Sequence, residues 1–326
     1  MSSINPDSNE ADIPLVPESL PGYPKTYQPF APDSPPAQRP QIFDTALRGV
    51  NKGFRLGDPV FQKPADARRW YAARRQVIDH LLRLVVGSVW HEHLVLRGSL
   101  LLKAWLGEAA REPGDIDWVF TPDSVGPSAP LATDLFTSLT QLVTKHPRVA
   151  EAEIDVDLIA INSIWTYERA DGRRIVFPWH ADGLPAGMVH MDVVFGEHLW
   201  SEPIDGVIPA LDGDRILVRS ASPELSLAWK LLWLQTDDYA QGKDLYDATL
   251  LAEHTRLRAS LLNQVLQAYQ LEPKTVSSAE FALRWDVDWE NFQLEYPWVE
   301  GDAEQWKQRL AQALAPTFAN TTSAAE

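Results

Sequence analysis

The chain has no cysteine among its 326 residues. Without cysteine there can be no disulfide scaffold, no disulfide-linked partner, no thiolate zinc site and no cysteine nucleophile. No hydrophobic run reaches the roughly 18 residues that span a bilayer. The N-terminus also lacks the basic flank and apolar block of a signal peptide. These absences predict a cytoplasmic protein that makes no membrane contact.

Basic residues are scarce as well: 29 lysines and arginines stand against 45 aspartates and glutamates, which gives a net charge of −16. A protein whose main task is to grip nucleic acid shows a basic footprint. The charge therefore disfavours a histone-like or repressor-like binder, but not an enzyme that meets an anionic substrate in one pocket. Apolar residues make up 45 % of the chain, which is enough for one large domain or two modest ones.

Proline is concentrated at the start, where residues 1–40 hold ten of the 25 prolines. Such a segment buries too little apolar surface to offset its chain entropy, although Tyr23, Tyr27 and Phe30 could form a short anchoring patch. The predicted division is a disordered leader at 1–40, an α/β domain at 41–218, a helical domain at 219–318 and a disordered tail at 319–326.

Hydrophobic periodicity predicts the elements of these two domains. The predicted helices cover residues 66–89, 100–105, 131–145, 223–235, 245–254, 257–269 and 304–313. The predicted strands cover residues 94–96, 115–120, 153–161, 174–177 and 188–195. The expected fold class is α+β, with a small mixed sheet flanked by helices and then an all-α half. We find no internal repeat.

Gly98 and Ser99 lie between a predicted strand and a predicted helix. A glycine there lets backbone N–H groups approach a phosphate, and the helix N-terminus favours negative charge. The alternative interpretation is a tight connection with no ligand, because so short a motif is common.

Asp115 and Asp117 are two residues apart on a predicted strand, so their side chains project from the same face. Paired carboxylates supply the oxygen ligands that Mg²⁺ prefers, although an ordinary exposed strand face has the same pattern. Asp192 is a single carboxylate on a later strand. If the two strands are neighbours, three carboxylates converge, and their mutual repulsion would itself call for a cation.

Glu153, Asp155 and Asp157 form a rival acidic set at i, i+2 and i+4. They could also hold a metal, but no Gly-Ser turn precedes them. We therefore interpret them as a solvated strand edge.

Lys230 lies on an otherwise apolar predicted helix, where it either extends its ammonium to solvent or points it into a cleft. Asp244 and Asp247 are three residues apart and share one face of the next helix. Asp244 could equally be an ordinary carboxylate at a helix N-terminus.

The remaining polar residues give weaker signals. His91 and His93 have no evident third ligand, so we interpret both as surface or structural residues. Arginines recur on the helix predicted at 66–89, and they form either an RNA-facing patch or a solvated helix face; these are Arg68, Arg69, Arg74, Arg75 and Arg83. There is no Gly-x-Ser-x-Gly elbow and no P-loop.

The order of these features resembles the nucleotidyltransferase (polymerase-beta-like) superfamily. Within it, the stretch LRGSLLLKAWLGEAAREPGDIDWVF resembles the AbiEii/AbiGii toxin family. The later LAWKLLWLQ and GKDLYDATLLAE are similar to that family's lysine motif and its Lys/Arg-Asp-Leu-Tyr-Asp motif. The resemblance covers about Leu94 to Glu253 and implies a nucleotidyltransferase-type N-terminal half.

The resemblance also implies residue roles. Gly98 and Ser99 would contact the triphosphate, and Asp115 and Asp117 would hold Mg²⁺ or Mn²⁺. Three further residues complete the implied site: Asp192 as a third metal carboxylate and acceptor base, Lys230 as a phosphate-binding catalytic lysine, and Asp244 as the family's essential aspartate. The family usually has Ser or Thr two residues before the first metal aspartate, where this chain has Pro113.

The implied function is metal-dependent transfer of a nucleoside monophosphate from an NTP to an acceptor hydroxyl, with the tRNA 3′ end as one candidate acceptor. The implied setting is a toxin–antitoxin or phage-defence system with an antitoxin encoded nearby. Two alternatives stay open. One is a non-catalytic nucleotide- or protein-binding module, an alternative that Pro113 and the acidic surface support. The other is a nucleotidyltransferase that acts on a small molecule.

Overall fold

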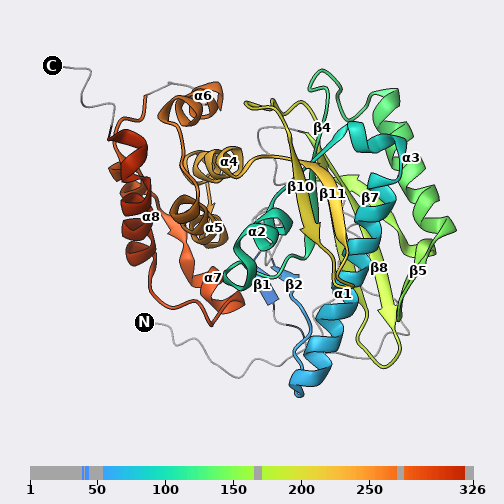
Figure 1. Cartoon of the computed structure of the whole chain (residues 1–326). Coiled ribbons are helices and arrows are strands. Elements are labelled where there is room, and N and C mark those ends of the chain that lie inside the picture. The colour runs from blue at the N-terminus through green and yellow to red at the C-terminus, as the bar shows by residue number, and fades with distance from the viewer. Residues whose placement is uncertain (1–38, 40, 44–53, 165–170, 270–274, 320–326) are drawn as a thin grey trace, which may run out of the picture.

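A computed structural model describes residues 39, 41–43, 54–164, 171–269 and 275–319 of the chain (Figure 1). The predicted leader lies outside the described residues except for Arg39, and so do Tyr23, Tyr27 and Phe30. Within the described part, no helix is both long and apolar enough to cross a membrane.

The centre of the fold is a nine-stranded mixed sheet in the order β10-β11-β3-β4-β9-β8-β6-β5, with β7 paired to β8. The pairings β11–β3 and β4–β9 are parallel and the others are antiparallel. Its strands are β3 (Leu94–Arg97), β4 (Asp115–Phe120), β5 (Arg148–Val149), β6 (Ala152–Ile154), β7 (Ala160–Ser163), β8 (Gly172–Ala181), β9 (Gly187–Val194), β10 (Ile204–Pro209) and β11 (Arg215–Ser220). The prediction of a small sheet is therefore wrong.

The sheet is larger for three reasons. The short edge strand β5 has only two residues and was not predicted. The hairpin β10–β11 was not predicted, because β10 carries Gly206 and Pro209 and only β11 alternates clearly between buried and exposed residues. The strand predicted at 153–161 is interrupted by the 3₁₀ turn η5 (Val156–Leu158), so it forms two short strands, β6 and β7.

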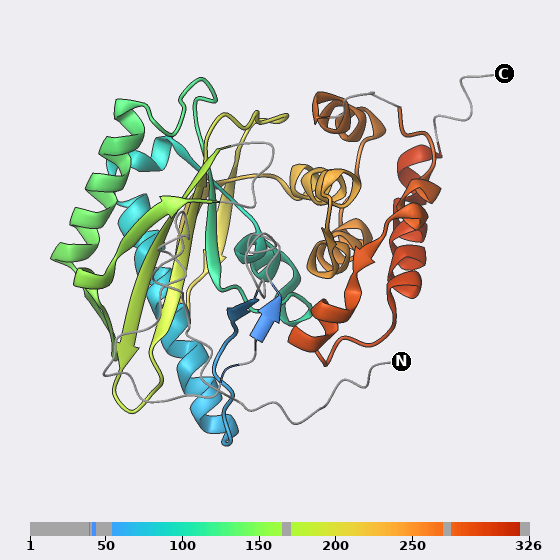
Figure 2. The same ribbon diagram turned by 180° about the vertical axis from the view of Figure 1, so that it is seen from behind.

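Helices cover both faces of the sheet (Figures 1 and 2). The α-helices are α1 (Pro64–Val86), α2 (Ser99–Leu106), α3 (Pro130–Lys145), α4 (Pro223–Thr236), α5 (Gly242–His254), α6 (Ala259–Tyr269), α7 (Trp289–Glu295) and α8 (Ala303–Phe318). Every predicted helix is confirmed within a few residues, while α7 was not predicted.

Strand alternation divides the interior into two cores. On β3 and β4, Leu96 and Trp118 pack against α1 and α3 in the first core. Val95 and Val119 point the opposite way and pack against α4 and α5 in the second core. The sheet is therefore buried on both faces, and the C-terminal helices cover one of them.

The part of the chain after Pro223 is mainly helical, as predicted. It also contains one short parallel pair, β12 (Ala240–Gln241) with β13 (Val287–Asp288), so it is not purely helical. Helices α4 and α8 begin at conventional caps: the Ser222 hydroxyl accepts from the Leu225 N–H, and Asp302 with Gln305 forms a capping box at α8.

Candidate active site

The predicted carboxylates lie together on the sheet face that the C-terminal helices cover. β4 and β9 are parallel neighbours, and their register places Asp117 beside Asp192 and Asp115 beside His190. The three aspartates share the face of Val119 and Val194, both of which belong to the second core. The sheet thus brings together residues that are up to 77 positions apart in the sequence.

The Gly98-Ser99 turn reaches the same place from β3. Gly98 has φ +84°, and a Cβ built on it would lie 2.2 Å from Asp117 Oδ2. Only glycine tolerates both the left-handed backbone and this approach. Helix α2 begins at Ser99, so a helix N-terminus opens beside the carboxylates, where it favours an anion.

Negative charge is concentrated at Asp117. Burial, followed by repulsion from Asp192 and Asp115, raises the pKa of its carboxyl to about 7, although Arg97 and Lys230 oppose the shift. Its neighbour Asp115 is more open, with 46 % of the side chain exposed. A buried carboxylate beside an accessible one is a donor set that suits a hard divalent cation arriving from solvent.

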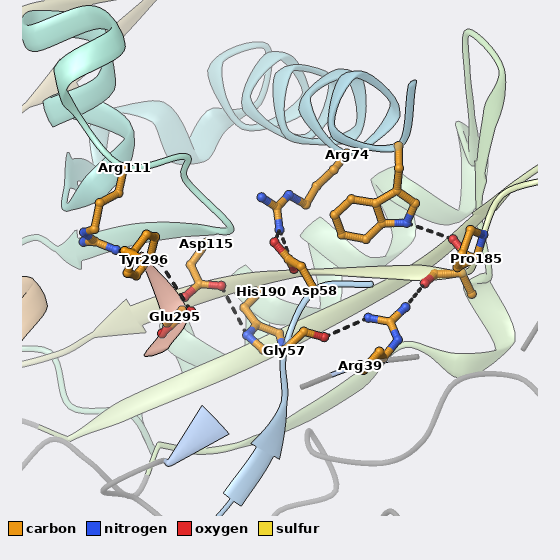
Figure 3. Close-up of polar contacts among 12 residues, drawn as sticks. Arg39, Gly57, Asp58, Arg74, Arg111, Asp115, Pro185, His190, Glu295 and Tyr296 are labelled. Atoms are coloured by element: carbon orange, nitrogen blue, oxygen red, sulfur yellow. Dashed lines mark hydrogen bonds and ion pairs between the residues drawn. The ribbon is translucent and has the colours of Figure 1, made fainter. Parts of the chain in front are cut away.

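Two of the aspartates have other polar contacts. Asp115 Oδ1 lies 3.3 Å from His190 Nδ1 (Figure 3). Asp192 accepts two hydrogen bonds from Arg174 on β8, from Nε and Nη2, each 2.7 Å long. Over the residues that the structure describes, no group of three or more His, Cys, Asp or Glu side chains is arranged to hold a metal ion. Asp115 and Asp117 are the pair of neighbouring carboxylates on this strand face that could hold a cation.

Two cations face the carboxylates. Arg97, next to Gly98, is opposite Asp117 in the β3–β4 register and donates to Glu197 at 2.6 Å. Its guanidinium lies 5.5 Å and 5.4 Å from the ring centroids of Trp229 and Trp233. Lys230 Nζ lies 4.9 Å from the Trp233 ring. Trp233 thus contacts both cations.

Lys230 points into the interior, so the interpretation in which its ammonium extends to solvent is wrong. Its ammonium donates to Asp244 Oδ1 at 2.7 Å and lies 3.0 Å from Asp247 Oδ2. Burial lowers the pKa of Lys230, but Asp244 and Asp247 outweigh that effect and hold it above its usual value. Lys230 therefore remains charged at neutral pH.

Asp247 also receives a bidentate arginine from the other half of the chain. Arg111 Nε and Nη2 donate to its two oxygens at 3.0 and 2.7 Å. Burial raises the pKa of Asp247, yet Arg111 and Lys230 lower it to about 2. Arg111 also donates to the Tyr296 hydroxyl at 3.2 Å (Figure 3). This network fixes α4 and α5 against the segment that leads into β4.

Three residues of this site were not among the predicted site residues: Arg97, Arg174 and Asp247. Arg97 could have been suspected, because it directly precedes the Gly-Ser turn. Arg174 gave no usable signal, since its meaning depends on a strand pairing that the sequence does not reveal. Asp247 was noted only as a neighbour of Asp244 on the helix.

The rival acidic set lies elsewhere. Asp155 follows β6 as the N-cap of the 3₁₀ turn η5 rather than continuing a strand face, and its Oδ1 pairs with His180 at 2.8 Å. His91 is exposed, and His93 Nδ1 lies 2.8 Å from the Thr121 carbonyl oxygen, as expected for surface and structural residues.

The arginines of α1 are used within the chain. Four of them form ion pairs with acidic residues: Arg69 with Glu151, Arg74 with Asp58, Arg75 with Asp79 and Arg83 with Asp212. The helix also packs on the sheet face opposite the aspartates. These contacts weigh against the RNA-facing interpretation of this helix.

Comparison with known proteins gives a family match. Residues 80–315 match the family model described as "Nucleotidyl transferase AbiEii toxin, Type IV TA system". No curated protein matches the chain.

Among solved structures, the chain is similar to a putative nucleotidyltransferase from H. pylori, with 11 % identity, a TM-score of 0.48, and coverage of 81 % of this chain and 99 % of that one. It is also similar to MenT4, a nucleotidyltransferase toxin from Mycobacterium tuberculosis, with 18 % identity, a TM-score of 0.46, and coverage of 80 % and 100 %. A third match is the antibiotic-resistance factor ANT(2'')-Ia, with 13 % identity, a TM-score of 0.32, and coverage of 60 % and 90 %.

Proposed function

From the premise that the chain belongs to the AbiEii nucleotidyltransferase toxin family, we propose that it transfers a nucleoside monophosphate from an NTP to an acceptor hydroxyl with the help of Mg²⁺ or Mn²⁺. The observation that carries this proposal is the contact between Gly98 and Asp117. It puts an anion-binding turn directly against a paired-carboxylate strand, so triphosphate and cation would meet at one point.

Each half of the chain supplies part of the chemistry. Backbone N–H groups at Gly98 and Ser99 bind phosphate oxygens at the start of α2. Asp115 and Asp117 hold the cation, which when bound neutralises phosphate charge and polarises the phosphorus centre. Lys230, kept protonated and in place by Asp244 and Asp247, adds a point charge from the helical half. Phosphoryl and nucleotidyl transfer depend mainly on such positioning and charge neutralisation.

The proposal also names an acceptor and a biological role. We propose the tRNA 3′ end as the first acceptor to test, and a toxin role that an antitoxin encoded nearby counteracts. We further propose that the protein works in the cytoplasm and serves phage defence. The paired arginines of α1 favour recognition of a short RNA end over an extended RNA surface, because little free positive charge lies on that helix.

The test is transfer of label from each of four α-labelled NTPs with Mg²⁺, with and without total tRNA. We expect labelled RNA with at least one NTP and none after chelation with EDTA. Asp117→Asn should reduce the rate about a hundredfold or more, because one of two cation ligands is lost.

The matched control is Asp155→Asn, which neutralises an aspartate outside the site and should leave the rate within about twofold. Nucleotide binding without any labelled product would favour the non-catalytic module instead. Labelling of a small hydroxyl compound without RNA would favour the small-molecule enzyme. Unreduced transfer by Asp117→Asn would refute the mechanism.

A further inference from the structure

The role of Asp192 is the feature of this site that the family resemblance and the structure describe differently. The resemblance makes it a third metal carboxylate. In the structure both of its oxygens accept from Arg174, and the pair is nearly inaccessible: 4 % of the Asp192 side chain and 15 % of the Arg174 side chain are exposed.

The sheet itself builds this pairing. Arg174 on β8 is the register partner of Asp192 on β9, while Asp117 is the partner of Asp192 on the other side. Directly opposed residues of neighbouring strands have Cβ atoms only about 5 Å apart. Asp192 therefore stands between one carboxylate and one guanidinium, and its side chain is turned to the guanidinium.

A bidentate arginine competes with a metal for the same lone pairs. The two parallel N–H···O bonds engage both oxygens in a planar geometry. To ligate a cation beside Asp117, Asp192 would have to rotate away and give up both hydrogen bonds to the nearly buried Arg174, which is costly. Charge balance agrees, because the Arg174–Asp192 pair is neutral and leaves Asp115 and Asp117 to match one divalent cation.

We propose that Arg174 is a positioning residue that withholds Asp192 from the metal, so that Asp115 and Asp117 are the only carboxylate ligands among the residues that the structure describes, and Arg174 sets the affinity for the cation. This inference rests on the proposed metal-dependent function, whose cation ligands it assigns. It also removes Asp192 as the base for the acceptor hydroxyl, since its oxygens already accept from a permanently charged donor.

The test is Mn²⁺ binding by the full chain, measured by electron paramagnetic resonance and by calorimetric titration without nucleotide. Arg174→Gln frees the third carboxylate, so we expect about tenfold tighter binding of Mn²⁺. Arg174→Lys keeps the positive charge but loses the bidentate geometry, so its Mn²⁺ affinity should lie between those of the wild type and Arg174→Gln.

The decisive variant replaces the whole pair. Arg174→Gln with Asp192→Asn is neutral, like the wild-type pair, and its two amides can still hydrogen-bond, so it keeps the test valid if a single variant unfolds. We expect its Mn²⁺ affinity to stay within about threefold of the wild type, while Asp117→Asn loses tenfold or more. Thermal melting without metal checks that each variant is folded.

Two results would overturn the inference, and they are distinguishable. If the double variant loses Mn²⁺ as strongly as Asp117→Asn does, Asp192 is a ligand and only this assignment fails. If wild type and Asp117→Asn bind Mn²⁺ equally, or neither binds it, the metal site of the proposed function fails as well.

Discussion

Gly98 is the residue on which the candidate site depends most directly, because two independent constraints meet there. Its backbone has φ +84°, and its Cα hydrogen occupies the space where a Cβ would collide with Asp117 Oδ2. Gly107 also has a positive φ, +58°, but a Cβ there would meet nothing within 4 Å. A comparison of substitutions at Gly98 and Gly107 therefore separates the effect of backbone strain from the effect of a collision with Asp117.

We therefore predict that Gly98→Ala lowers nucleotidyl transfer about a hundredfold, because it displaces Asp117 and the phosphate-binding turn by a fraction of an ångström or more. Gly107→Ala is the matched control and should cost only the strain of an alanine in the left-handed region, about 1 kcal/mol of stability. Steady-state rates and thermal melts of both variants check this. Equal loss of activity in the two would mean that strain alone explains the effect.

At the scale of elements, the helices α4 and α5 owe their placement to a buried ionic network. Asp247 accepts from Arg111 and contacts Lys230, and its side chain is 1 % exposed. Such a network stabilises little relative to apolar packing, but breaking one partner leaves uncompensated charges. The network thus fixes geometry, by holding Lys230 on the side of α4 that faces the carboxylates.

Asp247→Asn should reduce the free energy of unfolding by about 3–5 kcal/mol at pH 7, since two buried cations lose their shared anion. The folded pKa of Asp247 is about 2, below the ordinary value of about 4. Its contribution is therefore fully present above about pH 4 and is lost as the pH falls towards 2. Urea unfolding from pH 7 to pH 2 should show the difference between wild type and variant shrinking over that window.

The control for this prediction is Glu253→Gln, which breaks the more exposed pair with Arg309 and should cost less than about 1 kcal/mol. A comparable loss from both variants would show that Asp247 makes no special contribution.

The elements also show where sequence reasoning succeeds and where it stops. Local periodicity was enough for α1, α3 and α4, and the i, i+2 spacing was enough to put Asp115 and Asp117 on one face. The partner of each strand is a non-local property. Nothing local predicts that β8 brings Arg174 to Asp192, or that the hairpin β10–β11 extends the sheet.

At the scale of the molecule, the net charge of −16 limits which ligands the surface can attract. Four of the five α1 arginines are paired within the chain, and Asp115, Asp117 and Asp192 are partly compensated by Arg97, Arg174 and Lys230 at the site. Arg97, Arg174 and Lys230 therefore place positive charge at the carboxylates, whereas most of the α1 arginines are neutralised by acidic partners. This distribution suits an NTP with its cation better than it suits a long nucleic acid.

The two predicted domains share a core, and this bears on how the whole chain unfolds. Val95, Val119 and Val194 of the sheet pack in one cluster with Leu227 and Leu245 of the helical half. Polar contacts cross the same boundary: Arg111 reaches Asp247, and the Tyr246 hydroxyl donates to the Ala109 carbonyl at 2.6 Å. Separating the halves near residue 218 would expose an apolar sheet face. It would also take the buried Arg111 away from its ion-pair partner Asp247.

We therefore predict a single cooperative unfolding transition for the full chain, with equal calorimetric and van't Hoff enthalpies. A fragment of residues 219–318 should lack a cooperative melt and bind a hydrophobic dye, because its half of the shared core has no counterpart. Differential scanning calorimetry of the chain and circular dichroism of the fragment test both statements. Two resolved transitions, or a fragment that melts cooperatively, would mean that each half has a self-sufficient core. The site would then lie at an interface that can open, rather than inside one cooperative unit.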